Sequence, residues 1–195
     1  NITGGTAFNG MSGSWVLNTG TAVTGNGTFQ MPPTAINLPL TLPVGISALF
    51  SGDVTGTGGS LTVNGSLTWS FGALRIPATI ATGAVLTIDG TTSARILNAA
   101  FVQNGTASWL SGDFTFNNAS FTNGGTLTIN FSGTDHSIAR FATSTNSFTN
   151  TGTINKTDVS TLTFTSVPMS SSGMLSGVGT MNFAGTAPGG LTNTG

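Results

Sequence analysis

Four aspartates recur at nearly even spacing from residue 89 onward. Asp89, Asp113, Asp135 and Asp158 follow one another at intervals of almost two dozen positions. In a stacked fold with turns of that length, the four carboxylates would line one column, and carboxylate oxygens are ligands that calcium prefers. The alternative is that aspartate recurs once per turn because it is a favoured turn residue. The spacing leaves both interpretations open, and calcium is the only cofactor it suggests.

The most compact group of reactive side chains is Asp135 and His136, followed by Arg140. Polysaccharide hydrolases and lyases use paired carboxylates, or a bound metal ion with a base. This chain has no glutamate, no tyrosine and a single histidine. Adjacent residues of a strand point to opposite faces, so Asp135 and His136 are not expected to form a dyad. We therefore predict no catalytic residues and expect a protein that is not an enzyme.

Trp109 is the candidate for ligand binding. Trp69 is in phase with Leu67 and Phe71, and this alternation predicts a buried ring. Trp109 lies beside Leu110, where either a core position or a sugar-stacking position fits. A carbohydrate-binding or carbohydrate-active protein is therefore the alternative function.

The elements that would position these residues are short strands. Apolar residues alternate with Thr, Ser or Asn at 61–63, 67–71, 114–116, 127–131 and 162–164, and a period of two indicates half-buried strands. Gly and Asn, which favour turns, separate these segments. More than half of the chain is Gly, Thr, Ser or Asn, and only 5% is charged. The composition predicts an all-β protein.

A repeat favours one all-β architecture. The triplets Gly125-Thr126-Leu127, Gly152-Thr153-Ile154 and Gly179-Thr180-Met181 follow each other at one constant interval, slightly longer than that of the aspartates. A fixed period of this length is typical of stacked repeats, so we predict a right-handed parallel β-helix, a single β-solenoid domain over 1–195 with eight or nine coils. A β-sandwich is the alternative. The prolines at 32, 33, 39 and 43 predict a less regular part over 1–60, with a loop or distorted coils around 31–50.

The repeats resemble a known class of proteins. Residues 116–130 (FNNASFTNGGTLTIN) and 147–155 (SFTNTGTIN) are similar to the β-helical repeat regions of large bacterial surface and secreted adhesins, such as autotransporter passengers and filamentous-haemagglutinin-like proteins. The resemblance implies an extracellular or cell-surface adhesin, stalk or filament subunit, with surface glycans among its candidate partners. Thr-x-Thr segments at 149–153 and 161–165 also resemble ice-binding solenoids. However, the same threonine pair does not recur in every predicted coil.

Charge and hydropathy limit the other partners. The net charge of −1 gives no basic surface for nucleic acid, and no apolar run is long enough to span a membrane as a helix. A β-solenoid exposes strand edges at its ends, and no charged or proline-rich cap is evident near either end of this sequence. We therefore expect end-to-end self-association or continuation into further repeats.

Overall fold

The computed structural model describes the backbone of residues 2–9, 13–90, 94–184 and 191–193, and the side chains of 13–90 and 94–184. Its described residues form three parallel β-sheets and no helix, which confirms the predicted all-β solenoid. Consequently, none of them forms a helix of the length and apolarity needed to cross a membrane.

We name the sheets A, B and C. Sheet A contains β1 (Ile2–Asn9), β3 (Gly25–Met31), β6 (Ile46–Ser51), β9 (Ser66–Phe71), β12 (Val85–Ile88), β15 (Thr106–Trp109), β18 (Thr126–Ile129), β21 (Thr153–Lys156) and β24 (Met174–Gly177). Sheet B contains β2 (Trp15–Leu17), β4 (Thr34–Ile36), β7 (Val54–Thr55), β10 (Ala73–Leu74), β13 (Arg95–Leu97), β16 (Phe114–Phe116), β19 (His136–Arg140), β22 (Thr161–Thr165) and β25 (Thr180–Ala184). Sheet C contains β5 (Pro39–Leu42), β8 (Ser60–Val63), β11 (Ala78–Ile80), β14 (Ala100–Gln103), β17 (Ser120–Asn123), β20 (Ser147–Asn150), β23 (Met169–Ser171) and β26 (Leu191–Asn193).

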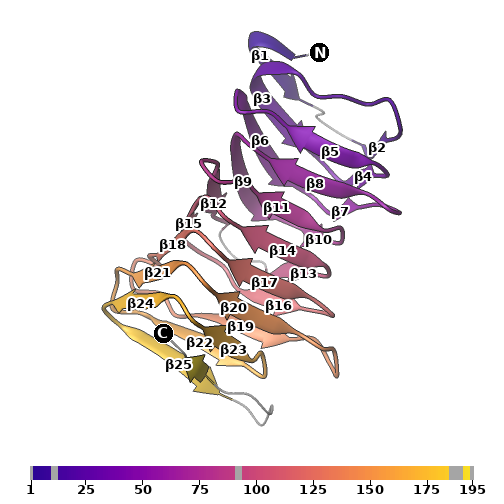
Figure 1. Cartoon of the computed structure of the whole chain (residues 1–195). Helices are drawn as coiled ribbons and strands as arrows, with labels where there is room; N and C mark the ends of the chain where they lie inside the picture. The colour runs from indigo at the N-terminus through magenta and orange to yellow at the C-terminus, as the bar shows by residue number, and fades with distance from the viewer. Residues whose placement is uncertain (1, 10–12, 91–93, 185–190, 194–195) are drawn as a thin grey trace.

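Each coil passes through sheets A, B and C in that order, and every strand pairs in parallel with its counterparts in the neighbouring coils. From β3 to β26 the chain completes about eight turns, preceded by β1 and β2. Figure 1 shows the coils stacked as a rod that runs from the indigo N-terminal strands to the yellow C-terminal ones.

The coils differ in length, which corrects the repeat predicted from the triplets. The stacked partners Ser47 and Ser66 are 19 residues apart, whereas the stacked partners Asn123 and Asn150 are 27 residues apart. Only the first two triplets stack, because Thr126 pairs with Thr153. The third triplet includes Thr180, which pairs with Thr161 in sheet B. The long interval between the triplets therefore belongs to one enlarged coil, whose extra residues lie at 130–135 and 141–146.

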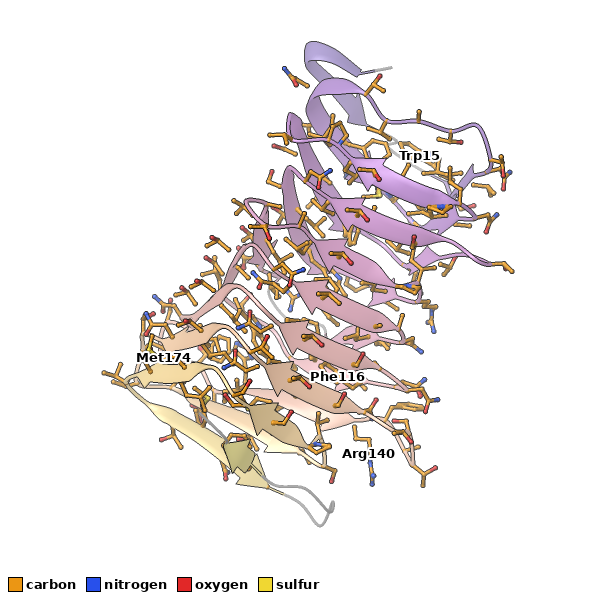
Figure 2. All side chains as sticks on the ribbon, viewed as in Figure 1. Trp15, Phe116, Arg140 and Met174 are labelled. Carbon is orange, nitrogen blue, oxygen red and sulfur yellow. The ribbon has the colours of Figure 1, made fainter. Side chains whose placement is uncertain are left out.

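The core is a continuous column of inward apolar side chains. Leu127, Ile129 and Phe131 are buried, as the alternation predicts, while Thr128 between them faces outward. Large rings fill the interior, and those of Phe121 and Phe148 stack with centroids 4.8 Å apart. Figure 2 shows the side chains that fill the space between the sheets. This apolar interior gives the rod its main hydrophobic stabilisation.

Residues 31–50, predicted as a loop or distorted coils, belong to coils of the solenoid, with a register shift between Phe50 and Ser51. Strands β4, β5 and β6 pair with their neighbours in all three sheets. The prolines avoid the strand interiors: Pro39 is the first residue of β5, and Pro43 lies in the turn before β6. Proline at these positions removes no essential ladder hydrogen bond, so the proline pattern does not exclude a coil.

Candidate functional site

All five aspartates of the chain lie in one part of the rod, the turns from sheet A to sheet B. We name this the aspartate corner, formed by Asp53, Asp89, Asp113, Asp135 and Asp158. The four evenly spaced aspartates therefore share one corner, as a column would require. Asp53 lies in the same corner. The sequence did not reveal this, because the interval between Asp53 and Asp89 is longer than the intervals between the other aspartates.

Most of these carboxylates bind backbone or hydroxyl groups of the following coil. Asp53 Oδ1 accepts a hydrogen bond from the Ala73 N–H at 2.8 Å. Asp113 Oδ1 accepts one from the Ser137 N–H, and Asp135 Oδ1 one from the Thr161 N–H, both at 2.7 Å. Asp89 Oδ1 accepts one from the Ser111 hydroxyl at 2.9 Å. The corner thus links successive coils by charge-assisted hydrogen bonds.

Asp158 forms a nearly buried ion pair with Lys156. Lys156 Nζ donates to Asp158 Oδ1 at 2.5 Å and to Ser160 Oγ at 2.8 Å, and its side chain is 2% exposed. Asp158 Oδ2 also accepts hydrogen bonds from the backbone of Phe131 and Gly133, both at 3.1 Å. Burial disfavours the charged carboxylate, but the hydrogen bonds from Lys156, Ser160 and Gly133 and the charge of Lys156 outweigh it. The pKa of Asp158 therefore lies well below its usual range.

The aspartate corner is held together by contacts within the protein. All five carboxylates have hydrogen-bond partners in the chain. Among the described side chains, no three acidic, histidine or cysteine groups converge as a metal site would require. Calcium binding at Asp89, Asp113, Asp135 or Asp158 stays a prediction, and the observed contacts assign these residues a structural role instead.

The polar group at residues 135–140 does not converge on one point. Asp135 binds the next coil, whereas His136 Nδ1 lies 3.2 Å from Asp113 Oδ1 in the preceding one. The Gly112 N–H donates to His136 Nε2 at 3.2 Å. Arg140 is exposed at the opposite end of β19. As expected from strand alternation, Asp135 and His136 do not form a dyad.

Arg95 is a buried cation that the sequence did not reveal. Its Nε donates to Trp69 O at 3.0 Å and its Nη1 to Ser111 O at 2.9 Å. Burial lowers the pKa of Arg95 to about 10, and the charges of Asp89 and Asp113 partly oppose that shift. The guanidinium is therefore protonated at neutral pH, and the two aspartates compensate its charge.

Trp109, the predicted sugar-stacking candidate, lies in the core. It is 1% exposed, and its ring contacts Phe114 and Phe131 edge to face. Its indole N–H donates to Ser111 O and Gly112 O. A ring enclosed in this way has no face available to a sugar.

A ladder of polar side chains lies inside sheet C. Gln103, Asn123, Asn150 and Ser171 stack in register and are all buried. Asn123 Nδ2 donates to Asn150 Oδ1 at 2.7 Å, and Asn150 Nδ2 donates to Ser171 Oγ at 3.0 Å. These bonds run along the rod axis and connect three coils. The ladder therefore has a structural role of its own.

The surface hollows of the described residues include two that are lined partly by a cation. One of about 220 Å³ lies at the turn from sheet B to sheet C and is lined by Arg140, Asn146 and hydroxyl side chains; Figure 2 shows Arg140 beside that turn. The other, of about 320 Å³, lies at the C-terminal end and is lined by Lys156, Leu175, Met181 and Phe183. Leu175, Met181 and Phe183 are only half buried, unlike their counterparts in the inner coils.

Comparison of the chain with protein-family models, curated proteins and solved structures finds no match.

Proposed function

We propose that this chain is a stiff, non-enzymatic segment of an extracellular or cell-surface protein, such as an adhesin, a stalk or a filament. The observation that carries the proposal is that its ionic and amide groups are used to join coils. The aspartate corner, in which Asp158 is paired with Lys156, and the ladder of polar side chains in sheet C each connect neighbouring turns. Together with three unbroken parallel sheets, they oppose bending and separation of the coils along the axis.

The composition supports an extended structural role. Hydroxyl and amide side chains form much of the outward faces of the sheets, and on these faces no column of like charges, which would repel one another, is found among the described residues. Reactive groups at the aspartate corner are engaged in hydrogen bonds within the protein. This arrangement favours a scaffold over a carbohydrate-active enzyme.

The C-terminal end supports association along the axis. The half-buried Leu175, Met181 and Phe183 line a hollow where the next coil of a longer solenoid would pack. We infer that a further repeat or a second copy covers this end through backbone hydrogen bonds and apolar contacts. Such an interface would resist salt, because charge contributes little to it.

Two measurements test the proposal. An antibody against the chain should label intact, non-permeabilised cells of the source or detect the protein in the medium, and labelling that requires permeabilisation would contradict the location. Incubation of the purified protein with bacterial and algal polysaccharides should release no reducing or unsaturated sugar ends. Sustained release of such ends would establish the enzymatic alternative instead.

A further inference from the structure

Sheet A presents two parallel columns of outward side chains. Over five consecutive coils, from β9 to β21, each strand contributes one residue to each column. The first column is Ser66, Val85, Thr106, Thr126 and Thr153, and the second is Thr68, Thr87, Ser108, Thr128 and Asn155. Eight of these ten residues are Thr or Ser, and none is charged. We name this surface the hydroxyl face.

The hydroxyl face is a two-dimensional lattice. Its strand pairs keep one register from β9 to β21, without a bulge. Neighbouring strands of a sheet lie about 4.8 Å apart, and residues two apart in one strand are separated by about 6.6 Å. These two spacings fix the repeat of the side chains along and across the rod. Figure 1 shows β12, β15, β18 and β21 following one another along one side of it.

Several of its hydroxyl groups are available to water, whereas that of Ser66 donates to Ser47 Oγ. Thr87, Thr106 and Thr128 make no side-chain hydrogen bond to another protein group within the described part of the chain, and each hydroxyl provides one donor and two acceptor sites. Threonine is branched at Cβ and restricted at χ1. Stacked threonines on equivalent backbone therefore hold their methyl and hydroxyl groups in repeated positions before any ligand arrives.

The other two sheets lack this arrangement. On sheet C, the column beside its outward threonines contains Ser60, Ser120 and Ser147, but it is interrupted by Pro39, Pro77, Ala100 and Pro168, which carry no hydroxyl group. On sheet B, the outward series includes Ile96 and Ala139. None of the ten residues of the hydroxyl face is aromatic, and sugar recognition on a flat surface depends on aromatic stacking. The face is thus better suited to an ordered water layer than to a polysaccharide.

We propose that the hydroxyl face binds ice. Its two repeats approach the oxygen–oxygen repeats along the two axes of a prism face of hexagonal ice, so water molecules held by successive hydroxyls would lie near lattice positions. Threonine methyl groups fill the spaces between these waters, and the lack of charge leaves no ion whose hydration shell would disturb them. The ligand is a crystal plane of water, which a rigid, repetitive surface can match over several coils at once.

The test measures thermal hysteresis and ice-crystal shape with the whole chain. Thr128→Lys places a long charged side chain at the centre of the hydroxyl face. The matched control, Thr115→Lys, makes the same change on the outward side of β16 in sheet B. Thermal melting followed by circular dichroism checks that both variants remain folded.

The parent protein is expected to give a measurable hysteresis gap and faceted ice crystals. Thr128→Lys should remove most of the gap, and Thr115→Lys should leave it unchanged. Three results would overturn the proposal: no hysteresis in the parent, an equal loss in both folded variants, or full activity in folded Thr128→Lys. Should Thr128→Lys fail to fold, Thr87→Val supplies the second variant, because it removes one hydroxyl of the face and keeps the branched shape.

Discussion

Replacement of Lys156 by methionine tests how much the buried Lys156–Asp158 ion pair stabilises the stacked coils. Methionine retains the apolar stem but removes the ammonium group, which bonds Asp158 and Ser160 and lies 5.6 Å from the centre of the Phe131 ring. Breaking a buried pair from one side typically costs about 3–5 kcal/mol. Asp158 keeps two backbone N–H donors from the preceding coil, so we expect a loss near the lower limit, about 3 kcal/mol at pH 7.

The pH dependence separates the ion pair from packing. Folding lowers the pKa of Asp158, so its contribution to stability is fully present above the unfolded pKa, about 3.9, and is lost as the pH falls below it. Each pH unit below that value removes up to about 1.36 kcal/mol. The difference between the parent and Lys156→Met should therefore shrink by about 2 kcal/mol between pH 6 and pH 2.

Urea unfolding followed by tryptophan fluorescence measures both quantities. Arg75→Met is the matched control, because Arg75 and Asp53 form an exposed pair at 3.4 Å, with side chains that are 43% and 44% accessible. Screening by solvent limits such a pair to less than about 1 kcal/mol. The reasoning is refuted if Lys156→Met costs no more than Arg75→Met, or if its cost is the same at pH 6 and pH 2.

Three further changes probe other contacts. Leu127→Asp places an unpaired charge at a position that is 1% exposed, so it should lower the free energy of unfolding by more than about 4 kcal/mol or prevent folding. The control Thr128→Asp, on the outward side, should remain within about 1 kcal/mol of the parent in the same urea titration. Gly125→Ala would set a Cβ atom 2.0 Å from the Gly105 carbonyl oxygen; a loss of about 1–3 kcal/mol is expected, and a stabilised variant would show that the coils are less closely stacked than described. Addition of a calcium chelator should leave the melting temperature unchanged, because hydrogen bonds satisfy the aspartate corner, and a fall that calcium restores would establish a bound ion.

The strands were predictable because their pattern is local. Alternation with a period of two identified the buried faces around Leu67–Trp69 and Leu127–Phe131, and it also excluded a dyad between Asp135 and His136. The same alternation could also have predicted that Lys156 is buried. This residue is in phase with the inward Ile154, and a charged residue at an inward position needs a buried partner, which Asp158 supplies.

The stacking order was less predictable because it depends on the lengths of the turns. Because the coils differ in length, the sequence does not show which strands stack on one another. The equal spacing of the three triplets is a coincidence, and it wrongly predicted that Thr180 stacks with Thr126 and Thr153. The same variation concealed the hydroxyl face, whose members become neighbours only through the register of sheet A. Arg95 gave no local signal either, since its partners Trp69 O and Ser111 O lie 26 and 16 residues away.

Distances between pairs of spin labels test the rod most directly. The chain contains no cysteine, so Leu49→Cys can be combined with Thr128→Cys or with Ser176→Cys, all in one outward column of sheet A. Four and six coil intervals separate these pairs, which predicts narrow distributions centred near about 19 Å and about 29 Å. A broad distribution, or a distance that does not increase with the number of intervening coils, would contradict a stiff solenoid.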